Sequence, residues 1–287
     1  MLYCVIIWSM NQPFFSIIIP TYNRATFLTK ALESVLEQTF RDFELIIVDD
    51  GSTDETPSLI KNCPDERLVY LPQPHQGVSA SRNAGVRASR GSWIAFLDSD
   101  DCFAPDKLTR AREYINQFPD FSVFHTEEIW YLNNRLLNQK NIHRKPEGDV
   151  FAQALRLCCI SPSTAVIRRD VFNTVGFFDE SLPACEDYDF WLRVSACLPI
   201  KLIPEVLTIK QGGHSDQLSR RFPGCMDTFR IKAITKLLDA GILSEAQRLL
   251  AITELQNKCR IYIAGAQKRR KDNEVKEYTE LMRAYGA

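Results

Sequence analysis

The residues best placed to do chemistry in this sequence are acidic side chains that follow apolar runs. Asp98 and Asp100 stand two positions apart at the end of one run, and Asp50 ends another. Carboxylates this close repel and raise one another's pKa, a cost that a divalent cation removes. Mg²⁺ or Mn²⁺ takes few protein oxygens and completes its shell with water and phosphates. The pattern at Asp98 and Asp100 therefore indicates a metal that holds a nucleotide diphosphate, although a surface turn or a helix N-cap gives the same pattern.

An aromatic ring near Asp50 suggests a binding site for a base. Tyr22 follows the apolar run 15–20, and Asp50 follows the run 44–48. A carboxylate can accept the imide N–H of a pyrimidine while a tyrosine stacks on its ring. The alternative is that Asp50 caps a turn and Tyr22 packs in the core. The first interpretation favours a uridine or thymidine nucleotide.

Four short apolar runs alternate with helical patterns in the first 118 residues. The run 15–20 is typical of a strand buried on both faces, and 44–48 of a second buried strand. A shorter strand is expected over 67–71 and a fourth over 93–97. Asn23 is expected to cap the helix that follows the first strand. Alternating strands and helices favour a mostly parallel sheet flanked by helices. Such sheets bind ligands beyond the carboxyl ends of their strands, so Tyr22, Asp50 and Asp98 should converge at one edge.

The later part of the chain has a less regular pattern. A strand is expected over 121–130 and helices over 149–159 and 185–196, and from Met226 onward the chain should be helical. The helix over 185–196 has an acidic first turn, which suits the positive end of a helix dipole.

Composition excludes several classes of protein. The 287 residues are 45% apolar and 25% charged, with a formal net charge of −1, which disfavours disorder and a strongly basic nucleic-acid binder. No apolar run reaches the ~20 residues that span a bilayer. The nine cysteines show no Cys-x-x-Cys spacing of the kind found in metal and redox motifs, which suits a reducing cytoplasm. Cys158 and Cys159 are expected to be buried. The basic run 268–271 is either an exposed helix face or a peripheral contact at the inner face of a membrane.

Several catalytic signatures are missing. The sequence has neither a phosphate-binding Gly-x-x-x-x-Gly-Lys loop nor a Gly-x-Gly-x-x-Gly turn, which disfavours kinases and dinucleotide enzymes. It also lacks a His-Glu-x-x-His zinc helix and a Gly-x-Ser-x-Gly nucleophile elbow.

Four segments, taken together, resemble a known family. The segments 16–24, 47–54, 77–85 and 96–101 are similar, in order and spacing, to the motifs of family 2 glycosyltransferases. The resemblance covers roughly residues 14 to 215. It implies a GT-A fold of the α/β class, with a mostly parallel central sheet flanked by helices. The domain ranges that we expect are an extension 1–12, a catalytic domain 13–222 with a nucleotide half 13–118 and an acceptor half 119–222, and a helical region 223–287.

The resemblance assigns roles to individual residues. It implies that Pro20, Tyr22 and Asp50 hold the base, and that Arg82 contacts the nucleotide. Asp98, Ser99 and Asp100 match the segment that touches ribose and metal, with Asp100 the direct ligand of Mg²⁺ or Mn²⁺. The acidic helix motif implies Asp187 as the catalytic base, with Glu186 and Trp191 in contact with a sugar. His214 resembles a late histidine of the family and is expected to bind metal or phosphate, or else to be an ordinary loop residue.

Chemistry gives Asp187 independent support. An acceptor hydroxyl must lose its proton as it attacks the sugar, and a positioned carboxylate can take that proton. Direct attack inverts the anomeric centre and needs no covalent intermediate, in keeping with the absence of a recognisable nucleophile. The alternative is that Glu186 and Asp187 only stabilise the start of a helix.

We therefore expect an inverting transferase that moves a sugar from a UDP- or dTDP-linked donor to a hydroxyl of a saccharide or lipid-linked saccharide. The resemblance suggests cell-envelope polysaccharide synthesis. Because no group of apolar spanning helices follows the domain, processive synthesis with export is not expected. Two alternatives remain: a sugar-phosphate nucleotidyltransferase, which would need a glycine-rich basic loop after the first strand, and a non-catalytic nucleotide-sugar-binding protein.

Overall fold

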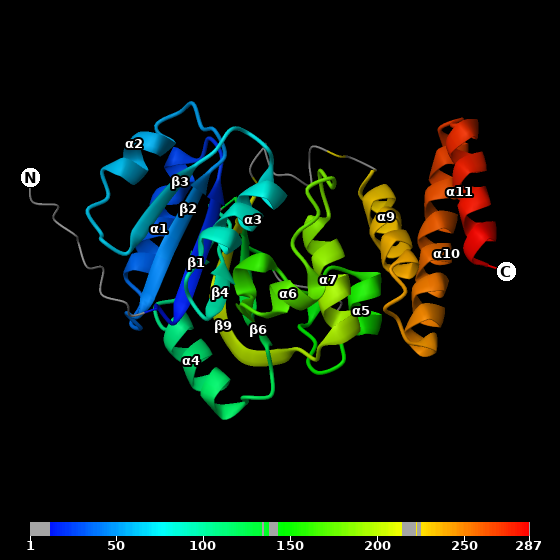
Figure 1. Cartoon of the computed structure of the whole chain (residues 1–287). Helices are drawn as coiled ribbons and strands as arrows, with labels where there is room; N and C mark the ends of the chain where they lie inside the picture. Colours follow the sequence, from blue (N-terminus) through cyan, green and yellow to red (C-terminus); the bar gives the residue numbers. More distant parts are fainter. Residues whose placement is uncertain (1–11, 134, 138–142, 214–221, 223–224, 287) are drawn as a thin grey trace, which may run out of the picture.

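A computed structural model of the chain describes residues 12–133, 135–137, 143–213, 222 and 225–286. In this part of the chain nine strands form one sheet in the order β3-β2-β1-β4-β8-β6-β9-β5, and β7 pairs with β6 (Figure 1). The strands are β1 Phe15–Thr21, β2 Phe43–Asp49, β3 Leu68–Pro72, β4 Trp93–Phe96, β5 Cys102–Phe103, β6 Val123–Leu132, β7 Arg135–Leu137, β8 Val166–Arg168 and β9 Lys201–Gly212. The helices are α1 Ala25–Leu36, α2 Thr56–Lys61, α3 Val78–Ala88, α4 Lys107–Gln117, α5 Phe151–Arg156, α6 Val171–Val175, α7 Glu186–Cys197, α9 Met226–Asp239, α10 Glu245–Lys268 and α11 Asp272–Tyr285.

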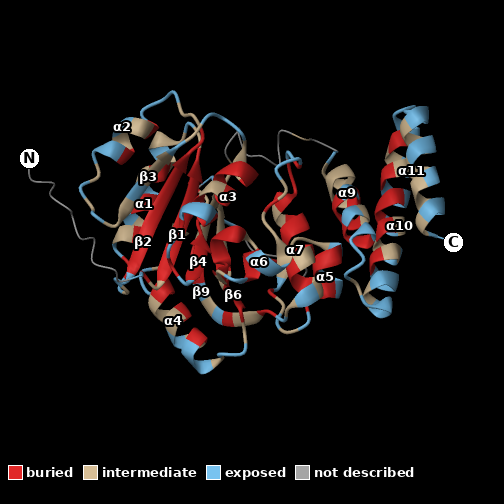
Figure 2. Ribbon diagram, viewed as in Figure 1, coloured by how far each residue is buried: buried red, intermediate tan, exposed pale blue. Residues whose placement is uncertain are grey.

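The first four strands pair in parallel, and β1, β2 and β4 are buried on both faces, as their apolar runs predict. Strand β3 is only partly buried, because it lies at the edge of the sheet. In β1, Ile17 and Ile19 face a core shared with α1 and α4, whereas Ile18 faces a second core shared with α3, α6 and α7. The sheet is therefore the middle of three layers, and Figure 2 shows β1, β2 and β4 almost wholly buried. Helix α3 lies close to β1 because Gly85 has no side chain: a Cβ there would lie 2.4 Å from Ile18 Cγ2.

The second half of the sheet mixes directions. Strand β8 runs antiparallel to both β4 and β6, while β6 and β9 are parallel and shift register near Thr126. The expected strand over 121–130 is confirmed as β6. The expected helix over 149–159 is wrong at its end, over 157–159, because Leu157 is extended (φ −149°, ψ 146°) and ends α5 at Arg156. Cys158 and Cys159 consequently leave the helix and are only half-buried.

Asn23 does not cap α1. The cap position is Arg24, and Asn23 instead takes a left-handed backbone conformation (φ 51°). Its side-chain oxygen accepts the backbone N–H of Thr53 at 2.8 Å, so it joins the loop after β1 to the loop after β2.

Three helices extend the molecule beyond the sheet, as the helical pattern after Met226 predicts. Helices α9 and α10 share a core with α5 and α7, and α11 packs along α10 at the end remote from β1 (Figure 1). Within the described residues, each helix is too short or too polar to cross a membrane.

Candidate active site

A cavity of about 1020 Å³ opens at the carboxyl ends of β1, β2 and β4. The edge predicted from the strand pattern is therefore the one that faces this cavity. The lining residues that were expected to form the site are Pro20, Tyr22, Asp50, Arg82, Asp98, Ser99, Asp100, Glu186 and Asp187. Residues at the strand ends and the acidic start of α7 thus line the same cavity, although α7 begins 104 positions after Arg82 in the chain.

Tyr22 and Asp50 are brought together by the parallel register of β1 and β2, in which Thr21 stands opposite Asp49. Asp50 is almost fully buried, and its carboxylate accepts hydrogen bonds from the loop before α3. Oδ1 accepts Gln73 Nε2 (2.7 Å) and the Gln76 N–H (2.9 Å), and Oδ2 accepts the Gly77 N–H (2.8 Å). Asp50 therefore orders the loop that leads into α3.

Arg82 joins the two sides of the cavity. It lies in α3 with 3% of its surface exposed, and it donates to Asp98 Oδ1 (2.8 Å) and Glu186 Oε1 (2.6 Å). Burial alone would raise the pKa of Asp98, but the charges of Arg82 and Lys210 hold that pKa below its usual value. Asp98 is therefore a carboxylate near neutral pH.

Lys210 is a second cation at this edge, partly buried, and no sequence motif indicated it. Its Nζ lies 3.1 Å from Asp101 Oδ2 and 3.9 Å from Asp98 Oδ2. Burial alone would lower the pKa of Lys210, but the carboxylates of Asp101 and Asp98 reverse this and raise it. Lys210, on strand β9, thus stays charged beside the carboxylates of Asp98 and Asp101.

Asp100 differs from Asp98 in the direction of its pKa shift and in its contacts. Burial and the negative charge of Asp98 raise its pKa, and no ion pair with its side chain occurs among the described residues. The carboxyl groups of Asp98, Asp100, Asp101 and Glu186 lie near the cations Arg82 and Lys210, and the charge of Arg24 also acts on Asp100. Burial raises the pKa of Asp101 to about 7. Clustered acidic groups with raised pKa values, and the oxygen chemistry of the donors, fit a divalent cation. In the described residues, however, His, Cys, Asp and Glu side chains form no cluster of three that could surround one, and His214 lies outside these residues.

Asp187 projects from the first turn of α7, half-buried at the cavity wall. Its Oδ1 accepts the backbone N–H of Tyr188 (2.7 Å), and the thiol of Cys158 donates to its Oδ2 (3.4 Å). Burial and the charge of Asp187 raise the pKa of Cys158, so this thiol remains protonated and able to donate. The sequence suggested only a buried apolar role for Cys158, because the early end of α5 that turns it toward the cavity has no evident sequence signal.

Of the two residues expected to contact a sugar, Glu186 lines the cavity and Trp191 does not. Trp191 is 1% exposed, packs edge to face on Phe190 (ring centroids 5.1 Å apart) and does not line the cavity. Glu186 lines the cavity, but its carboxylate is engaged by Arg82.

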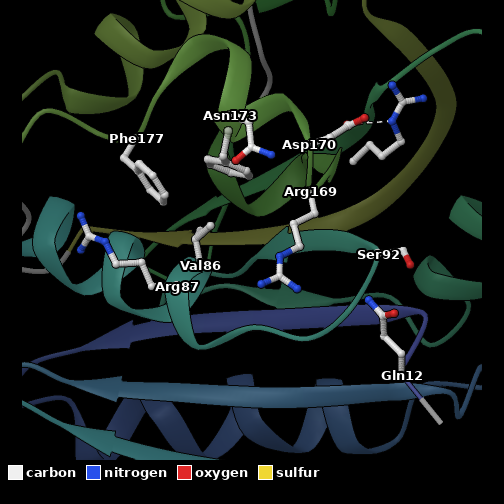
Figure 3. A pocket seen from close by; sticks show the side chains of 10 residues that line it. Gln12, Val86, Arg87, Ser92, Arg169, Asp170, Asn173 and Phe177 are labelled. Atoms are coloured by element: carbon white, nitrogen blue, oxygen red, sulfur yellow. Dashed lines mark hydrogen bonds and ion pairs between the residues drawn. The ribbon is translucent and has the colours of Figure 1, made fainter. Parts of the chain in front are cut away.

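A smaller cavity, of about 420 Å³, lies where β4 begins, at the opposite end of the sheet (Figure 3). Arg87, Arg169 and Asn173 line it, and Figure 3 shows the guanidinium of Arg169 between Val86 and Ser92. No residue expected in the active site lines this cavity. The candidate chemistry is therefore confined to the larger one.

Comparison with known proteins identifies the family. The model described as Glycosyl transferase family 2 matches residues 16–176, a range that ends before α7. An uncharacterized glycosyltransferase of Rickettsia conorii is 32% identical over 223 residues, which make up 77% of this chain but 35% of that protein, so this chain spans about a third of its length. One from Rickettsia prowazekii is 31% identical over 219 residues, or 73% of this chain and 67% of the relative.

Solved structures support the same assignment at the level of the fold. S. aureus TarS 1-349 in complex with UDP-GlcNAc has a TM-score of 0.71 and 23% identity, over 85% of this chain and 72% of that chain. The mannosyltransferase PcManGT from Pyrobaculum calidifontis, in complex with GDP-Man and Mn²⁺, has a TM-score of 0.62 and 18% identity, over 96% of this chain and 85% of that one. The expected GT-A fold is confirmed, and with the family match it follows that the chain belongs to glycosyl transferase family 2.

Proposed function

We propose that this protein transfers a sugar from a UDP- or dTDP-linked donor to a hydroxyl of a saccharide or lipid-linked saccharide, with inversion at the anomeric carbon. The observation that carries the proposal is the position of Arg82, which binds Asp98 at the donor edge and Glu186 beside Asp187. A donor held at Asp98 would present its sugar to Asp187 in the same cavity.

The nucleotide is proposed to lie along the ends of β1, β2 and β4. Tyr22 would stack on the base, Asp50 would accept its imide N–H, and Pro20 would line the base site. Arg82 and Ser99 would contact the ribose and phosphate side. The UDP-GlcNAc of the TarS complex supports a uridine donor here.

Asp100 and Asp98 are the residues that would hold Mg²⁺ or Mn²⁺, with His214 as a further candidate. A bound divalent cation supplies positive charge against the diphosphate as it leaves. Lys210, held between Asp98 and Asp101, adds positive charge from the protein itself. The Mn²⁺ in the PcManGT complex supports this proposal.

Asp187 is proposed to take the proton of the acceptor hydroxyl. Its carboxylate faces the cavity and is fixed by the Tyr188 N–H and the Cys158 thiol, which hold it in one orientation. A general base so placed contributes about 10²–10⁴-fold in rate. Attack from the side opposite the leaving diphosphate inverts the anomeric centre.

The acceptor would enter past a largely apolar part of the cavity wall. The side chains that form this part are Trp130, Ile160, Leu182, Pro183, Phe222 and Met226. Aromatic faces of this kind bind sugar rings and apolar chains alike, which supports a saccharide or lipid-linked acceptor. A role in cell-envelope polysaccharide synthesis stays a prediction from the resemblance.

Calorimetry with UDP and Mn²⁺, followed by hydrolysis assays on a panel of nucleotide sugars, tests the proposal. We expect UDP to bind more tightly with Mn²⁺ than with EDTA, and at least one donor to be turned over. Binding without turnover of any donor would favour a non-catalytic nucleotide-sugar-binding protein. No binding of UDP or dTDP would refute the proposal.

A further inference from the structure

His75 contacts both groups that are proposed to hold the donor's base. Its ring stacks on Tyr22, with centroids 4.1 Å apart and planes inclined by 23°. Its Nδ1 lies 2.8 Å from Asp50 Oδ2 and 3.2 Å from the Asp50 carbonyl oxygen, so this ring nitrogen faces two acceptors of the same residue. A pyrimidine base would make the same two contacts, a stacked face on Tyr22 and an N–H to Asp50.

Of the described groups that donate to Asp50, His75 is the one most easily displaced. The Gln76 and Gly77 donors are backbone N–H groups of an ordered loop, and Gln73 is half-buried with a second bond to Ser81 (3.3 Å). The His75 side chain is 52% exposed. A carboxylate has about four acceptor positions, and the position at Oδ2 that the His75 ring covers is the one that the protein can most readily free.

The stack leaves no room for a base between the two rings. Aromatic atoms in contact are separated by about 3.5 Å, so a base between Tyr22 and His75 would need about 7 Å. The ring centroids are 4.1 Å apart. A base can therefore stack on this face of Tyr22 only if His75 moves away.

We propose that His75 occupies the place of the donor's base in the empty protein and is displaced when the nucleotide binds. The inference rests on the proposed function, because it assumes that Tyr22 and Asp50 bind a base. By keeping Asp50 hydrogen-bonded and Tyr22 covered, His75 keeps the site ordered without donor. Its removal should make the binding-competent state more populated and therefore lower the apparent Kd.

The test compares UDP binding to wild type, His75→Ala and His75→Phe by calorimetry with Mn²⁺. If His75 covers the site in nine of ten molecules, His75→Ala should bind UDP about tenfold more tightly. His75→Phe keeps a ring over Tyr22 but has no donor for Asp50, so its Kd should lie between the two. Binding of Mn²⁺-pyrophosphate, which has no base, should be the same in all three proteins. Thermal unfolding verifies that the variants are folded.

A second measurement follows the ring itself. In the NMR spectrum of the full chain, the His75 ring protons should be shifted upfield by Tyr22 and should return toward the values of a free histidine when UDP is added. Equal or weaker UDP binding by His75→Ala, or unchanged ring shifts on binding, would overturn the inference and make His75 a contact to the bound base. If wild type binds no UDP, the proposed function and the inference fall together, whereas the other failures leave the function standing.

Discussion

The proposed nucleotide half, residues 13–118, and the proposed acceptor half, residues 119–222, hold their site residues by different means. In the nucleotide half, Tyr22, Asp50 and Asp98 follow the ends of three parallel strands whose register brings them to one edge. In the acceptor half, Asp187 is fixed by contacts between segments distant in sequence, such as its bond to Cys158. The ends of parallel strands meet at one edge of the sheet, so the strand pattern alone brings together the residues that follow them. The position of Asp187 depends instead on how separate elements pack.

Arg82 is where the two halves meet. It bonds Asp98 of the nucleotide half and Glu186 of the acceptor half, and it is almost completely buried. The comparison therefore predicts that changes at Asp187 affect catalysis alone, changes at Asp100 affect donor binding, and changes at Arg82 affect the whole fold.

The largest effect is expected at Asp187. Asp187→Asn removes the proposed base without changing its size, so kcat should fall by about 10²–10⁴-fold, with the Kd of UDP within about twofold of wild type. Glu180→Gln is the matched control, since Glu180 lines the same cavity and is nearly half exposed, with a long ion pair, 3.7 Å, to Arg87. Its Oε1 accepts Asn83 Nδ2 (2.8 Å), and the amide oxygen of glutamine can accept the same bond. Its kcat should be nearly unchanged. Equal losses of kcat in the two variants would contradict a catalytic role that is specific to Asp187.

At Arg82 the expected effect is on stability. Arg82→Met leaves Asp98 and Glu186 without their buried partner, and breaking such a pair costs about 3–5 kcal/mol in the free energy of unfolding. Arg168→Met is the control, because its ion pair with Asp170 is largely exposed and should contribute less than about 1 kcal/mol. Urea denaturation of both variants measures the difference. A similar small loss in each would mean that Arg82 does not join the halves.

Acid should destabilise the acceptor half through His125 of β6. Burial, with the nearby charge of Lys145, lowers the pKa of this imidazole to about 3, so the native state stays neutral where the unfolded chain takes up a proton. Stability should fall as the pH drops below about 6.5, by about 2 kcal/mol at pH 5 from this residue alone. His125→Gln should lack this part of the pH dependence. Parallel stability curves for the two proteins between pH 5 and 7 would contradict the prediction.

The dependence of UDP binding on Mn²⁺ should distinguish the role of Asp100 from that of Asp187. Asp100→Asn should weaken UDP binding at least about tenfold in Mn²⁺, because one of the proposed cation ligands loses its charge, and should change it little in EDTA. Calorimetry under both conditions measures this. An equal change with and without Mn²⁺ would assign Asp100 a role other than metal binding.

Cys158 should act as a positioning residue with the smallest effect. One thiol hydrogen bond to Asp187 is worth about 1 kcal/mol, so Cys158→Ala should lower kcat about threefold to tenfold and leave the KM for the donor unchanged. Cys158→Ser, which restores a donor, should recover most of the rate. If Cys158→Ser loses as much of kcat as Cys158→Ala, the thiol contributes by filling space and does not orient the carboxylate of Asp187.

The donor edge could be predicted from sequence because its rule is local: an apolar run, then a polar side chain, repeated along a parallel sheet. Arg82 was expected to contact the nucleotide, but its bond to Glu186 depends on how α3 and α7 pack. The end of α5 at Arg156 and the stack of His75 on Tyr22 likewise arise from tertiary contacts. Lys210 lies within an ordinary strand pattern, so only the pairing of β9 with β5 and β6 brings it to the acidic edge.

The most direct test of one shared cavity is a crystal structure with UDP and Mn²⁺. The account predicts uracil at Tyr22 and Asp50, the metal at Asp100, and the diphosphate in the hollow that Asp187 faces. A nucleotide bound elsewhere, for example beside Arg169 in the smaller cavity, or a diphosphate turned away from Asp187, would contradict it.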